Sequence, residues 1–184
     1  MTLRMKAPEV HKLMSRIWTP FLCEHGLQRT SKTRKGWGSL ESSEGVLTIG
    51  YELGVGYYDW TGNSIELQGE VRTATQRHVA SLEPSAVLPQ SGTYPIALRN
   101  SLRMLGVRRL SELLEQGQVD DPASPNYVIL HESFHDELRA ANQNPRYVPP
   151  FRYLDEDDLR TWCKIVLPHI PECITTLMSF LHHD

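Results

Sequence analysis

The sequence predicts an α+β fold, in which a small antiparallel sheet packs against N-terminal and C-terminal helices. Residues from about 37 to 72 alternate between apolar and polar side chains, as strands with one buried face do. Residues 8–25 and the mainly helical region 95–181 carry apolar residues at helical spacing instead. The strands are therefore grouped rather than alternating with helices, and 184 residues suit a single domain covering 1–184.

The first element, residues 8–25, is predicted to be an amphipathic helix. Pro8 suits the first helical turn, and Gly26 suits the position just past the end. Pro20 falls inside the pattern and removes a backbone donor, so we expect a kink or a split near Thr19. The apolar positions of this helix are Val10, Leu13, Met14, Ile17, Trp18, Phe21 and Leu22.

The central region predicts two or three antiparallel strands joined by turns, each with one buried face. The segment from Pro84 to Pro95 holds three prolines and is expected to be a surface loop. The side chains expected to face the core are Leu47, Ile49, Tyr51 and Leu53 in one strand and Ile65, Leu67 and Val71 in the next.

Helical spacing returns after residue 95, with apolar residues recurring up to Gly106 and again up to Gly117. Asp155 is expected to cap a later helix, whose first turn is rich in carboxylates. Pro168 and Pro171 are expected to interrupt that helix, and one more apolar stripe follows them.

Composition narrows the classes of function. A net charge of −3 argues against a general nucleic-acid binder, which is usually basic. No apolar run has the length of a membrane span, and residues 1–11 lack the apolar core of a secretory signal. The three cysteines form no C-x-x-C pair, so we expect reduced thiols and a cytoplasmic location.

One segment indicates metal-dependent hydrolysis. Residues 131–135 are His-Glu-Ser-Phe-His, an H-E-x-x-H motif. On a helix, residues four apart share a face, so His131 and His135 could hold one zinc ion. Glu132 could then activate a metal-bound water as the general base. The reading requires a helix, a third ligand and a cleft open to water.

With a glutamate downstream, at Glu156, the segment 128–162 resembles the gluzincin metallopeptidases. The resemblance implies that His131, His135 and Glu156 bind zinc. The chain departs from that pattern twice: charged residues follow the second histidine, and Asp157 stands where a small residue is usual.

The same residues have a structural interpretation. His131 falls within an apolar stripe and could be a hydrogen-bonded core histidine. Glu132, Asp136 and Glu137 would then form a solvated face, and Glu156 would serve the start of its helix. Residues 127–130 begin this helix in one reading and form a short buried strand in the other.

A second resemblance covers residues 8–72, where Pro20-Phe21-Leu22 and His25-Gly26-Leu27 precede a basic stretch, a tryptophan and a strand. This arrangement resembles a bacterial domain family of unknown function, and the layout is similar to that of toxin-neutralising immunity proteins. The resemblance supplies no catalytic residues.

The leading hypothesis is a non-enzymatic bacterial protein that binds another protein, as an immunity-type inhibitor of a toxin or effector does. No cofactor is expected for this function. The alternative is a zinc-dependent metallohydrolase that uses the H-E-x-x-H site with Glu156. The candidate partner-binding residues are Tyr57, Tyr58, Trp60, Asp155, Asp157 and Asp158.

Overall fold

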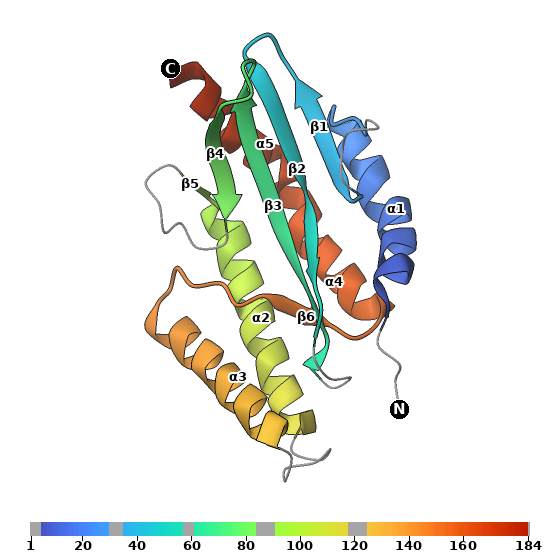
Figure 1. Ribbon diagram of the computed structural model, residues 1–184, viewed down its shortest axis with the longest axis vertical. Coiled ribbons are helices and arrows are strands. Elements are labelled where there is room, and N and C mark those ends of the chain that lie inside the picture. Colours follow the sequence, from blue (N-terminus) through green and yellow to red (C-terminus); the bar gives the residue numbers. More distant parts are fainter. Residues whose placement is uncertain (1–4, 30–34, 57–60, 84–90, 118–124, 184) are drawn as a thin grey trace.

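The computed structural model describes residues 5–29, 35–56, 61–83, 91–117 and 125–183. Its described part contains one six-stranded sheet with the strand order β1-β2-β3-β4-β5, and β6 pairs with β3 beyond the end of β4 (Figure 1). All the pairings are antiparallel except that of β4 with β5. The strands are β1 (Trp37–Glu41), β2 (Gly45–Gly54), β3 (Asn63–Thr73), β4 (His78–Glu83), β5 (Ser91–Thr93) and β6 (Phe151–Tyr153).

Helices lie behind the sheet and along its sides, which confirms the predicted α+β class (Figure 1). In that view α4 and α5 lie behind the strands, α1 lies beside β1, and α2 and α3 lie at the other side. The helices are α1 (Ala7–Glu24), α2 (Ile96–Gly117), α3 (Pro125–Gln143), α4 (Glu156–Val166) and α5 (Ile170–Ser179), with 3₁₀ turns at Leu167–His169 and Phe180–His183.

The first helix has the predicted extent but does not break. Gly26 follows it with a φ of +81°, a conformation that glycine adopts without strain. The predicted split near Thr19 is wrong, because α1 continues through Pro20 to Glu24. Pro20 lies on the exposed side of the helix, where water can bond the carbonyl that its missing N–H leaves free.

The core lies between the sheet and helices from the two ends of the chain. The Trp18 indole packs 5.6 Å from that of Trp162 and edge-on to the Tyr51 ring at 5.8 Å, measured between centroids. These contacts join α1 to both α4 and β2, and both indoles are buried. Of the predicted core positions in β2 and β3, Leu47, Ile49, Tyr51, Ile65, Leu67 and Val71 are buried and Leu53 is partly buried.

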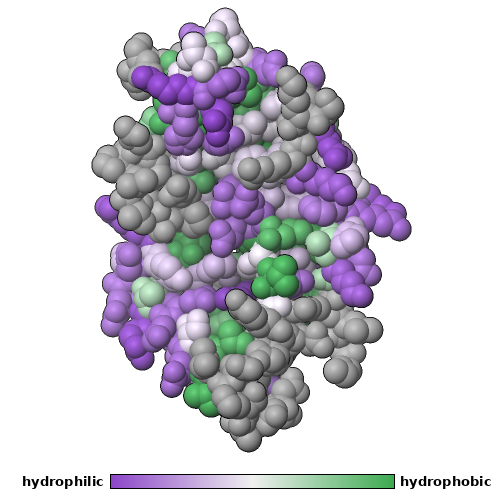
Figure 2. All heavy atoms as spheres, in the orientation of Figure 1, coloured by the Kyte–Doolittle hydropathy of each residue, from purple (hydrophilic) through white to green (hydrophobic). Residues whose placement is uncertain are grey.

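The opposite face of the sheet is polar. Because successive residues of a strand point to opposite sides, the residues between the buried ones face away from α1, α4 and α5. We call this surface the polar sheet face, and Figure 2 shows hydrophilic side chains over the strands on this side of the molecule. It consists of Thr48, Gly50 and Glu52 of β2 and Ser64, Glu66, Gln68 and Glu70 of β3.

A second, smaller core lies between α2 and α3. The first half of α2 contributes Leu98 and Leu102 to the main core, whereas its second half packs against Phe134 of α3. Gly106 lies between the two halves. Glycine is a poor helix former, yet α2 continues through it without interruption. The residues of this core, which we call the hairpin core, are Leu110, Leu113, Leu114 and Phe134, with Leu138 and Leu154 packed against them.

Some of the predictions for the second half of the chain are confirmed, and others are wrong. Residues 127–130 belong to α3, so the alternative of a short strand is wrong. Asp155 caps α4 as predicted, because its carboxylate accepts a hydrogen bond of 3.0 Å from the Asp158 N–H. A 3₁₀ turn separates α4 from α5 at the predicted prolines. The short strands β4, β5 and β6 were not predicted.

Gly106 provides a test of packing against helix propensity. A methyl group at this position would lie 2.8 Å from both Cγ and the carbonyl oxygen of Pro149. We expect Gly106→Ala to lower the free energy of unfolding, because overpacking costs about 1–3 kcal/mol and the gain in helix propensity is only about 1 kcal/mol. Urea unfolding measures the change. Asn100→Ala, at an exposed position of the same helix, should instead raise stability by roughly 0.5 kcal/mol.

Candidate functional site

The two histidines of the H-E-x-x-H motif lie together on α3, as the motif predicts. Their ring centroids are 4.5 Å apart and their planes are nearly perpendicular. His131 is half-buried and His135 is exposed, so the pair lies at the surface of the helix. The helix and the shared face are therefore present, and the zinc reading depends on a third ligand.

Glu156 does not join the two histidines. It is the first residue of α4, where its Oε1 accepts a hydrogen bond of 2.8 Å from Arg160 Nε. It also lines a hollow with Glu9 and Arg16 of α1. Among the described residues, which include all three proposed ligands, no group of three His, Cys, Asp or Glu side chains could hold a metal ion. The predicted zinc triad is thus not assembled, because α4 starts beside α1 whereas α3 packs on α2.

The charged residues that follow the motif do not all face solvent. Asp136 forms an exposed ion pair of 2.9 Å with Arg139. Glu137 turns toward β6 and forms an ion pair of 2.8 Å with Arg152, in which the two side chains are only 17% and 16% exposed. The prediction of a solvated face is therefore wrong for Glu137. The Arg152 guanidinium also lies 4.4 Å from the centroid of the Phe134 ring, at cation–π distance.

An open hollow runs along this side of α3, with a volume of about 450 Å³. We call it the α3 hollow. Three of its six lining residues are acidic, and Glu132 of the motif is one of them. The Tyr147 ring lies at its edge and is half-buried, and burial together with nearby Glu137 raises the pKa of Tyr147. The lining residues are Glu132, Ser133, Asp136, Glu137, Ala140 and Tyr147.

The α3 hollow adjoins the polar sheet face at Arg152. In the register of β3 with β6, Arg152 lies opposite Ser64, so its side chain is on the same side of the sheet as Glu66. Glu66 experiences the charges of both Arg152 and Glu137. The Glu137–Arg152 ion pair therefore lies between the carboxylates of α3 and Glu66 of the sheet.

Two carboxylates face each other on the polar sheet face. Glu52 lies directly opposite Glu66 in the pairing of β2 with β3. Burial of the half-buried Glu66 raises its pKa, and the nearby Glu52 raises it further, although a hydrogen bond from Gln68 opposes the shift. Like charges directly opposite in an antiparallel pair are destabilising, so this arrangement weakens the free protein.

The predicted partner-binding residues fall into two groups. Tyr57, Tyr58 and Trp60 lie outside the described residues. Of the acidic residues that begin α4, Asp157 is exposed, whereas Asp155 and Asp158 are half-buried and take part in internal contacts.

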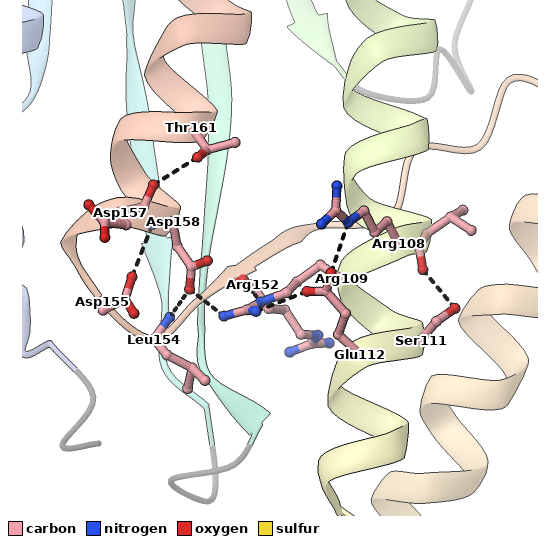
Figure 3. Close-up of polar contacts among 11 residues, drawn as sticks. Arg108, Arg109, Ser111, Glu112, Arg152, Leu154, Asp155, Asp157, Asp158 and Thr161 are labelled. Carbon is pink, nitrogen blue, oxygen red and sulfur yellow. Dashed lines mark hydrogen bonds and ion pairs between the residues drawn. The ribbon is translucent and has the colours of Figure 1, made fainter. Parts of the chain in front are cut away.

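Asp158 is held in the fold by contacts from two elements (Figure 3). Its Oδ2 pairs with Arg109 of α2 and accepts a hydrogen bond of 2.8 Å from the Leu154 N–H. Burial raises the pKa of Asp158 even though these contacts favour its charged form. Arg109 also donates to the Arg152 carbonyl oxygen at 3.0 Å, so the network reaches β6.

Sequence reasoning missed this grouping of carboxylates as a unit. The alternation of the strands already placed Glu52 and Glu66 on the exposed face, so that signal was present in the sequence. Their direct opposition depends on the strand register, and the approach of Glu137 depends on β6. Neither can be read from local spacing.

Comparisons of the chain with protein-family models, with curated proteins and with solved structures found no match. Across the part of the chain that the structure describes, no helix combines the length and the apolar character that crossing a membrane requires. The three cysteines are free thiols; Cys23 is exposed, and burial raises the pKa of Cys163 and of Cys173 to about 12.

Neutralising Glu66 should stabilise the protein at neutral pH. Its pKa is raised in the folded state, so stability falls as the pH rises from the pKa of the unfolded chain to that of the folded one, and the loss is complete above it. We expect Glu66→Gln to raise the free energy of unfolding by roughly 0.5–1 kcal/mol at pH 7 and to have little effect below about pH 4. Glu70→Gln is the control, because Glu70 forms an ion pair of 3.1 Å with Arg72 and its removal should bring no gain.

The separation of Glu156 from the two histidines also has a measurable consequence. We expect untagged protein, dialysed after growth with added zinc, to contain no stoichiometric metal, because Glu156 does not join the two imidazoles as a third ligand. Elemental analysis by mass spectrometry measures the content. One zinc per chain that His131→Ala removes and Glu156→Gln leaves unchanged would show that another residue completes the site.

Proposed function

We propose that this chain is a non-enzymatic protein-binding domain, of the kind that immunity-type inhibitors represent, and that its acidic surface takes a basic segment of the partner. The surface combines the polar sheet face with the α3 hollow. The observation that carries the proposal is the direct opposition of Glu52 and half-buried Glu66. A lysine or arginine of the partner placed between them would replace repulsion with attraction.

The charge balance around this pair supports a cationic partner. The α3 hollow adds Glu132, Asp136 and Glu137 to the two sheet carboxylates. Of the nearby cations, Arg152 and Arg139 each form an ion pair with an α3 carboxylate. A surface rich in carboxylates steers a basic partner and favours the correct orientation in the encounter.

The form of the surface supports a protein rather than a small ligand. The hollow is open, and the strands that form the polar sheet face are long, so the two areas together are extended. Tyr147 gives this area an aromatic side chain of the kind that is enriched in protein interfaces. In this proposal the Glu132 carboxylate contributes negative charge for binding a cationic side chain, and it needs no metal ion for that role.

The experiment compares two variants of equal charge. Glu52→Gln with Glu132→Gln neutralises the acidic surface, whereas Glu24→Gln with Glu172→Gln neutralises exposed carboxylates on α1 and α5. Tagged wild type and both variants are used to recover partners from the source organism, and each candidate is then purified and titrated by calorimetry. We expect the acidic-surface variant to weaken binding about tenfold or more, with a steep salt dependence in the wild type, and the control variant to bind normally.

Two results would contradict the proposal. The first is a purified partner that binds all three proteins equally. The second is failure to recover any basic partner in repeated experiments. Asp157→Asn, tested in the same titration, separates the acidic start of α4 from the surface proposed here, because Asp157 is exposed and lies on another element.

A further inference from the structure

The second half of α2 and the whole of α3 have few apolar connections to the rest of the protein. Among the side chains that the structure describes, their shared hairpin core is separate from the main core and fully buries four. Arg103 of α2 donates two hydrogen bonds to the Ala141 carbonyl oxygen, at 3.1 and 2.6 Å, so the two helices are also bonded to each other. These contacts hold the hairpin together, and Leu154, which directly follows β6, also packs against the hairpin core.

The attachment depends largely on two arginines. Arg152 of β6 extends to α3, where it pairs with Glu137 and lies over the Phe134 ring. Arg109 of α2 extends in the opposite direction, to Asp158 of α4 and to the Arg152 carbonyl oxygen. Figure 3 shows Arg109 and Asp158 pointing toward each other across the space between α2 and α4. We call these two sets of contacts the arginine latch.

The ion pair of Arg152 with Glu137 in the arginine latch is only partly hydrogen-bonded. Arg152 Nε and Glu137 Oε2 are buried without a hydrogen-bond partner, so the pair does not satisfy all of its polar atoms. A partly satisfied ion pair recovers less of the cost of leaving water than a fully bonded one. Glu66 and Glu137 also repel each other across the same space.

We propose that the hairpin, residues 107–117 of α2 together with α3, detaches from the sheet and unfolds as one cooperative unit before the main core unfolds. The boundary between this unit and the rest of α2 is the buried Gly106, which packs against Pro149. In the open state the arginine latch is broken, and Phe134 is exposed together with Glu137. Sub-global opening of this kind is expected where few apolar contacts join a segment to the rest of a domain. The proposal does not depend on the proposed binding function.

Native-state hydrogen exchange of the full chain, read by mass spectrometry over a series of low urea concentrations, tests the proposal. We expect amides of α3 and of residues 107–117 to exchange through an opening with a smaller urea dependence than that of β2 and β3, because less surface is exposed. An α3 that exchanges with the same urea dependence as β2 and β3 would overturn the proposal without any variant.

A matched pair of variants tests the latch itself. Glu137→Gln removes the charge that holds Arg152, and it should speed exchange in α3 more than about tenfold while exchange in α1 and β3 stays unchanged. Asp136→Asn removes the neighbouring exposed pair with Arg139 and should change neither region. Equal acceleration of α3 and β3 by Glu137→Gln would show that the latch belongs to the main cooperative unit.

Discussion

Arg152 lies in the three-residue strand β6, and its guanidinium contacts Glu137 and Phe134 of α3 while its carbonyl oxygen accepts from Arg109 of α2. The attachment of the hairpin to β6 depends on this residue. Its backbone extends the sheet beside β3, and its side chain positions the hairpin over the same side of the sheet as Glu66. A half-buried cation that must be neutralised by a carboxylate thus sets where α3 lies, and the ion pair lies between the two acidic areas.

The H-E-x-x-H segment illustrates which properties local sequence can specify. Helical spacing determines that His131 and His135 share a face, and the structure confirms this part of the prediction. A third ligand must come from another element, so its position depends on packing rather than on spacing. The capping of α4 by Asp155 and the proximity of α1 direct Glu156 away from α3. The motif therefore contributes Glu132 to an acidic surface instead of completing a zinc triad.

The sequence predicted the fold wherever a long pattern specified it. Alternation identified β2 and β3 and their buried residues, and helical spacing identified α1. It failed for β5 and β6, because three residues are too few to show a period. The split that it allowed for at Pro20 does not occur, since buried Trp18 and Leu22 on either side stabilise the helix through packing. The opposition of Glu52 and Glu66 required a register that no single strand reveals.

The contact between Trp18 and Trp162 has a consequence for the order in which the protein is made. These indoles lie near opposite ends of the chain and are buried against each other. At about 5–20 residues per second, a ribosome adds Trp162 on the order of 10 s after Trp18. During that interval the apolar stripe of α1 has no partner helix. The nascent chain therefore presents an exposed amphipathic segment to chaperones, and the main core closes only after α4 has been synthesised.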